Sequence, residues 1–146
     1  MSSELRVDKI IPTDGVPTGG GGGIIQIKQT SFNAHPSLSN TTMAAVSGWS
    51  PVVITPKFNT SKILITSNPM FLLNNGSGAS QKVALKLLRG STGIFERNDF
   101  ATYQVGTGQA DYLGMALYHQ YLDSPATTSA VTYKIQIRQH AGGGTT

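Results

Sequence analysis

The chain has 146 residues, of which 38% are hydrophobic and only 12% are charged, with a formal net charge of +4 and no cysteine. The length suits one domain with a modest core, and the lack of cysteine excludes disulfides, thiolate catalysis and cysteine-based zinc sites. The positive charge is spread without a basic run, and no apolar stretch approaches the roughly 18 residues of a membrane span. We therefore expect neither nucleic-acid binding nor membrane insertion.

A run of five glycines, residues 19–23, divides the chain. Glycine has no side chain to bury and loses the most backbone entropy on ordering. The run is interpreted either as a flexible joint or as a close-packed crossing at a symmetry axis, where only glycine fits. We therefore expect an N-terminal arm over 1–18, a linker over 19–23 and a body over 24–146. The arm is too short to fold alone, and we predict that it attaches the protein to a partner through Leu5, Arg6, Val7, Asp8, Lys9 and Ile10.

Alternating apolar and polar residues predict several short strands in the body. The clearest is 131–138, in which Val131, Tyr133, Ile135 and Ile137 face inward. Residues 111–123 fit both a strand and a helix, and the β-rich neighbours and Gly114 favour a strand. Loops are predicted over 31–47, 98–109 and 123–129, and turns over 74–78 and 89–93. The other predicted strands are 24–30, 52–55, 61–67 with a continuation over 70–73 past a bulge at Pro69, 82–89, and one beginning at Ile94.

About six to eight short strands at this spacing indicate an all-β fold. We expect an antiparallel β-sandwich or jelly roll with an extended N-terminal arm and a glycine linker. In the strand 82–89, Lys82 and Lys86 lie on the face opposite Val83, Leu85 and Leu87. This pattern predicts a sheet with one face in water.

The sequence carries no recognisable catalytic motif, and we expect no enzyme activity and no cofactor. The three histidines, His35, His119 and His140, lie far apart, so a surface or packing role is favoured over metal binding. Glu96 and Asp99 fall in a predicted loop, where a solvated pair is commoner than a carboxylate dyad for sugar hydrolysis. The glycine run lacks the Lys-Ser/Thr of a phosphate loop, and no Gly-x-Ser-x-Gly elbow is present.

Aromatic rings with polar edges suit sugar faces, so exposed tyrosines are candidate glycan contacts. We expect Trp49 and most of the set Tyr112, Tyr118 and Tyr121 to lie in the core or in an interface. Tyr103 lies among Gly and Thr residues in a predicted loop. It is therefore the candidate contact with a receptor or glycan.

Four short motifs, in order along most of the chain, resemble those of known proteins. Residues 3–10 resemble an S-E-[LI]-[RK]-V-[DN]-x-I opening, and residues 56–65 resemble an "sSKilI" strand. Residues 87–92 resemble an "l-x-R-d-G-t" hairpin, and residues 122–136 an "lDsP…tYkvq" segment. The family with these motifs is that of marine and cyanobacterial phage virion structural proteins, either tail fibre-like or virion-surface β-sandwich proteins.

This resemblance implies a virion protein with a β-sandwich body that is commonly trimeric. The expected partners are further copies of the chain, other virion proteins bound through the arm, and a host-surface glycan. The favoured function is a tail fibre or adhesin subunit on the virion, and a capsid or tail decoration (cement) protein and a carbohydrate-binding module are the alternatives. The chain departs from the family pattern after Arg138, because it ends at Thr146 without the usual closing strand. Either the sequence is incomplete or the closing strand comes from elsewhere, and an unpaired edge would favour subunit pairing.

Overall fold

The fold is an antiparallel β-sandwich, seen here in a computed structural model that describes residues 24–33, 36–37, 39, 41–75, 81–103 and 111–141. Within these ranges the chain forms strands and no helix, and hence no helix long enough to span a membrane. The predicted all-β class is therefore confirmed. The arm and the glycine linker lie outside the described residues.

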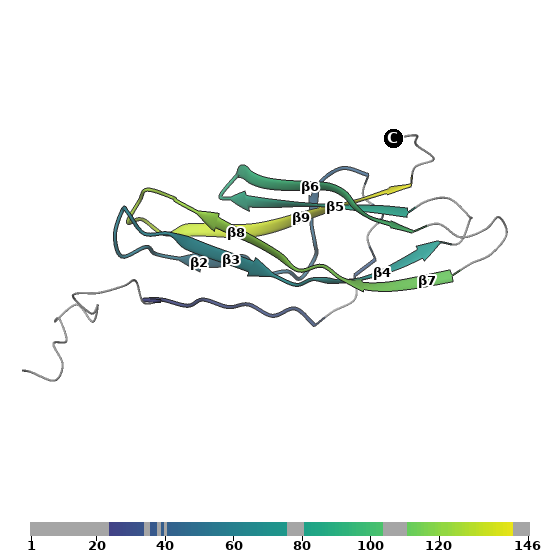
Figure 1. The fold of residues 1–146 in the computed structure, drawn as a ribbon, viewed down its shortest axis with the longest axis horizontal. Helices are drawn as coiled ribbons and strands as arrows, with labels where there is room; N and C mark the ends of the chain where they lie inside the picture. Colours follow the sequence, from purple (N-terminus) through teal and green to yellow (C-terminus); the bar gives the residue numbers. More distant parts are fainter. Residues whose placement is uncertain are drawn as a thin grey trace, which may run out of the picture.

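The described residues form nine strands (Figure 1). They are β1 (Ala44–Ala45), β2 (Val52–Ile54), β3 (Ile63–Ser67), β4 (Met70–Asn75), β5 (Gln81–Arg89), β6 (Thr92–Tyr103), β7 (Asp111–Ala116), β8 (His119–Asp123) and β9 (Val131–Ala141).

The first layer is a sheet in the order β1-β9-β5-β6, in which β2 also pairs with β9. The central strands β5 and β9 place Leu85 opposite Ile137, and both side chains are fully buried. On the outer face of the sheet Lys86 Nζ lies 3.0 Å from the Glu96 carboxylate, and both side chains are about one-third exposed. Lys86 is therefore partly exposed on the outer face, as predicted, whereas Ala84, which the same alternation puts on that face, is only 1% exposed.

The second layer is a long two-stranded ladder in which β3 pairs with β8 and β4 pairs with β7. The ladder is interrupted at Pro69, which has no N–H to donate, but Leu117 N still donates to Pro69 O at 2.9 Å. The register is the same on both sides of the interruption, since Ser67 faces His119 and Met70 faces Ala116. We call β3, β4, β7 and β8 together the ladder.

The hydrophobic core lies between the two layers. Its buried residues include Val46, Leu73, Val83 and Ile137, which come from both layers and from the turn after β1. Phe32 and Trp49 pack against this cluster with their rings edge to face, 5.6 Å apart. Trp49 is therefore a packing residue, as the sequence predicted.

The strand predictions are largely confirmed, including 52–55, 61–67, 82–89, 131–138 and the choice of strand over helix for 111–123. Four predictions are corrected. Residues 98–103 continue β6 along β5 and are not a loop, and residues 74–75 belong to β4 and not to a turn. The predicted loop 31–47 contains the two-residue strand β1. Residues 24–30, predicted to be a strand, run extended but pair with no strand among the described residues (Figure 1). Alternation of side chains predicts an extended backbone, but it does not supply the neighbouring strand that a sheet requires.

The burial of β5 leads to a direct test of the core. We expect Leu85→Ala to lower the free energy of unfolding by about 2–5 kcal/mol, because it removes fully buried methyl groups and leaves a cavity. Val53→Ala is the control, because Val53 is half exposed and should cost roughly 1 kcal/mol or less. Urea denaturation measures both values. Equal losses for the two variants would contradict the placement of β5 at the centre of the core.

Candidate functional site

A buried polar cluster lies at one end of the sandwich, where the two layers meet. Arg89 ends β5, Asp123 ends β8, and Tyr133 lies opposite Arg89 in the pairing of β5 with β9. Arg89 Nη1 donates to both oxygens of Asp123 at 3.0 and 3.2 Å, and Tyr133 Oη donates to Asp123 at 2.6 Å. The single carboxylate therefore joins the ladder to the first sheet.

Burial determines how these groups interact. Asp123 is only 5% exposed, and burying a carboxylate is costly unless charged and hydrogen-bonding partners surround it, as Arg89 and Tyr133 do here. Burial raises the pKa of the Tyr133 hydroxyl above its usual value, and the hydrogen bond to Asp123 raises it further. Tyr133 is consequently a proton donor to Asp123 and is not available as a base.

The surroundings of the cluster are held by further contacts. Lys62 Nζ lies 2.7 Å from Ser124 Oγ, and Gly90 N donates to Thr132 O at 2.8 Å. Gly90 has a positive φ of 60°, which glycine adopts without steric cost at this turn. A shallow open depression lies here, lined by Arg89, Gly90, Pro125, Thr127, Ala130, Val131 and Thr132. The charged residue of this lining, Arg89, is already held by Asp123, so the cluster links the two layers as a structural clamp.

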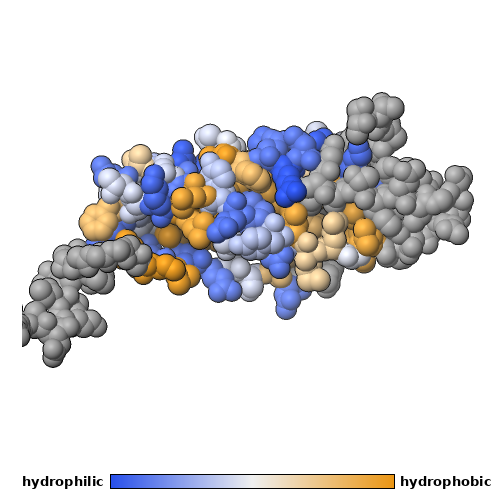
Figure 2. Space-filling view, viewed as in Figure 1, coloured by the Kyte–Doolittle hydropathy of each residue, from blue (hydrophilic) through white to orange (hydrophobic). Residues whose placement is uncertain are grey.

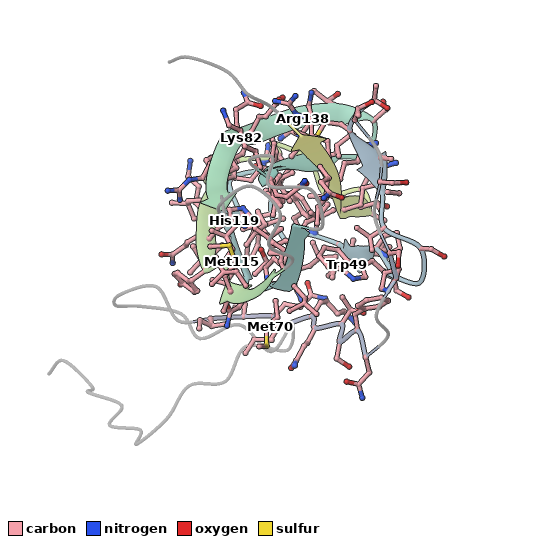
Figure 3. All side chains as sticks on the ribbon, turned by 90° about the vertical axis from the view of Figure 1, so that its right-hand side faces the viewer. Trp49, Met70, Lys82, Met115, His119 and Arg138 are labelled. Carbon is pink, nitrogen blue, oxygen red and sulfur yellow. The ribbon has the colours of Figure 1, made fainter. Side chains whose placement is uncertain are left out.

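A second polar pair lies inside the body, where β3 and β8 place Ser67 opposite His119. Ser67 Oγ and His119 Nδ1 are 2.6 Å apart, and the imidazole stacks on Phe95 with ring centres 5.1 Å apart. His119 is 4% exposed and lies between the layers in the end-on view (Figure 3). Its Nε2 is buried without a hydrogen-bond partner. Ser67 is partly buried and His119 is buried, so the pair packs within the body.

The predicted site residues do not come together at one place. The arm residues Leu5, Arg6, Val7, Asp8, Lys9 and Ile10 lie outside the described residues. Tyr103 ends β6 opposite Gln81 and is therefore on a strand, contrary to the predicted loop; its side chain is outside the described part. Glu96 is also on β6 and is engaged by Lys86, which contradicts its predicted place in a loop. Tyr118, which has a described side chain, is 61% exposed and so does not lie in the core.

Sequence reasoning missed the cluster of Arg89, Asp123 and Tyr133, although all three residues lie in motifs that were noticed separately. The hairpin motif contains Arg89, and the motif of residues 122–136 contains Asp123 and Tyr133. Lys62, in the motif of residues 56–65, reaches the same end of the body through Ser124. The signal in the sequence was a pair of oppositely charged residues, Arg89 and Asp123, each at the end of a predicted strand. In the described chain no three metal-ligating side chains gather.

Comparisons with protein-family models, with curated proteins and with solved structures find no match to this chain. The functional interpretation therefore depends on the residues and their geometry.

The buried carboxylate gives a test of the clamp. We expect Asp123→Asn to lower the free energy of unfolding by about 2–4 kcal/mol, because Arg89 and Tyr133 lose a charged acceptor. Tyr133→Phe should cost about 1–2 kcal/mol, because it removes one hydrogen bond to the carboxylate. Glu96→Gln is the matched control, because it breaks a one-third-exposed pair worth roughly 1 kcal/mol or less. If denaturant titrations give Asp123→Asn the same small loss as Glu96→Gln, the two layers are not joined through this carboxylate.

The buried histidine predicts a pH dependence. Burial lowers the pKa of His119 below its usual 6.5, and the charge of Arg97 lowers it further. As pH falls below about 6.5 the unfolded chain binds a proton at this site that the folded chain resists, so stability declines with falling pH. Above that pH both states are neutral and the contribution is complete. We expect His119→Gln to reduce this slope in denaturation measured between about pH 8 and pH 5.

The control for this slope is His35→Gln, which changes a histidine outside the described residues. If the slope is unchanged in His119→Gln and reduced in His35→Gln, then His35 causes the pH dependence. That result would contradict the burial of His119.

Proposed function

We propose that this chain is a bacteriophage virion structural protein, a tail fibre or adhesin subunit anchored by its N-terminal arm. In this proposal the body is a jelly roll that forms a homotrimer and faces the host. The observation that carries the proposal is the way the chain enters the body. Residues 24–30 are extended, exposed and unpaired, and the segment is held to the core farther along by Phe32 (Figure 1). A segment of this kind separates an attachment arm from a folded body.

The convergence of the motifs gives a second support. Three of the stretches that resemble phage virion proteins meet around Asp123 and Ser124 at one end of the sandwich. Motifs that meet in one structural clamp are stronger support for the resemblance than motifs scattered over a surface, because their residues contact one another. The resemblance accordingly concerns a structural unit, which fits a particle component.

The surface of the described residues also fits a structural role better than a catalytic one. The depression near Arg89 is open, and its arginine is already engaged by Asp123. In the Ser67–His119 pair the histidine is buried and stacked on Phe95. A sugar-binding role would need exposed aromatic rings in a group. Tyr118 is exposed, while Trp49 is packed on Phe32 and Tyr121 lies near Phe95.

The test uses the arm. We expect deletion of residues 1–18 to abolish incorporation into phage particles while the body remains folded, because the arm holds the attachment residues. The measurement is the protein content of purified particles, compared with circular dichroism of the purified variant. Substitution of Val53→Asn, a change on the body surface, is the control and should leave incorporation intact. Particles that retain the deleted form at normal copy number would contradict the proposal.

The position of the protein on the particle separates the fibre from the decoration protein. A few copies at the tail, with purified body blocking adsorption, support the fibre. Display over the whole capsid, with no effect of the purified body on adsorption, supports decoration.

A further inference from the structure

The two faces of the sandwich differ in chemistry. On the outer face of the first sheet Lys86 pairs with Glu96, and Arg138 Nη2 donates to Asn98 Oδ1 at 2.9 Å. The outer face of the ladder is largely apolar. Its large exposed side chains are Leu64 at 55%, Met70 at 80%, Leu72 at 69%, Tyr118 at 61% and Leu122 at 59%.

The ladder register explains why these side chains gather. Side chains alternate between the two faces of a strand, and the register does not change at Pro69, so the alternation continues along the whole ladder. Leu64 faces Leu122 directly across the ladder, and Met70 faces Ala116. In the end-on view Met70 points away from the core while Met115 points into it (Figure 3). The apolar residues therefore lie on one outer face, in two groups separated by the exposed pair Thr66 and Gln120.

The segment of residues 24–30 lies on the same side of the body. Figures 1 and 3 both show it beyond the ladder, and Figure 2 shows hydrophobic residues mixed with hydrophilic ones along the lower side of the molecule. Ile24 and Ile27 are 83% and 75% exposed, so the segment does not cover the ladder of its own chain, and the ladder does not cover the segment. We call the outer ladder face and this segment together the apolar side.

We propose that the apolar side is the contact between copies of this chain, with the residue 24–30 segment of one copy packed on the outer ladder face of the next. A second copy is the fitting occupant because the chain itself carries both halves of the contact. The segment has unpaired backbone and exposed isoleucines, and in the described residues β3 pairs only with β8 and β4 only with β7, which leaves open strand edges.

Charge plays little part in this contact. The ladder face carries Lys62 at one end and the segment carries Lys28, and neither surface has an acidic residue among its described positions. A contact between copies needs no opposite charge, and most soluble oligomers are built from identical subunits. This inference deepens the proposed function and rests on its self-association, but not on the virion or on the arm.

The first experiment measures association of the full-length purified protein by sedimentation velocity over a concentration series. We expect wild type to associate, and Ile27→Asn and the double variant Met70→Asn/Leu72→Asn each to weaken association by about tenfold or more. Val53→Asn replaces an exposed aliphatic residue of the first sheet and should shift association by roughly twofold or less. Monomeric wild type, or equal association of Met70→Asn/Leu72→Asn and Val53→Asn, overturns the proposal.

A second measurement guards against a variant that fails to fold. Because the chain has no cysteine, Met70→Cys and Val53→Cys each introduce a single thiol. In concentrated protein the Met70→Cys thiol should react with a soluble thiol reagent about tenfold more slowly than the Val53→Cys thiol, and after dilution to monomer the rates should converge. Equal rates at high concentration overturn the proposal, and protection that persists in the monomer overturns it as well, because the segment would then fold onto its own ladder. Neither result bears on arm-dependent incorporation into particles, so failure here and failure of the proposed function are distinguishable.

Discussion

The buried carboxylate of Asp123 decides which residues of the ladder face inward. It accepts hydrogen bonds from Arg89 and Tyr133, both of which belong to the opposite layer. A one-residue slip of β8 would turn Asp123 to solvent and Leu122 into the core. Hydrophobicity opposes that slip only in part, because the slip would turn Gln120 inward together with Leu122, which is apolar and exposed in the observed register. The ionic cluster opposes it further, since the slip would leave Arg89 and Tyr133 without their acceptor. The clamp thus fixes the register, and the register places the apolar residues on the outside.

The same relation marks the limit of prediction from sequence. Where one face is apolar and the other polar, as in 82–89 and 131–138, alternation predicts both the strand and its orientation. Residues 70–73 are all apolar, so the sequence predicts that the strand continues there but cannot tell which of its faces is buried. The loop predicted at 98–103 is wrong because the partner strand β5 extends beside it, and this contact is not local. The clamp joins residues 34 positions apart, Arg89 and Asp123, so the motifs could be noticed singly without showing that they meet.

An apolar surface on each side of the ladder is costly for a protein that works as a single chain, because exposed apolar patches promote association. It is expected of a subunit. The polar outer face of the first sheet, with Lys86 and Glu96, then remains toward solvent, while the ladder and the residue 24–30 segment take part in contacts between copies. Under the two proposals the arm, the segment and the ladder would have separate tasks: the arm would bind the particle, the segment would reach a neighbour, and the ladder would receive a neighbour's segment. The sandwich gives these elements a fixed frame.

Amide hydrogen exchange of the residue 24–30 segment tests this account most directly. These amides pair with no strand among the described residues, so in a monomer they should exchange at the rates of an open peptide. The account predicts that in concentrated protein they are protected, together with the ladder strands β3 and β4, and that protection of the segment is lost on dilution while the amides of β5 remain protected. Unprotected exchange of residues 24–30 at every concentration would contradict it, because the segment would then have no partner in either the chain or its neighbour.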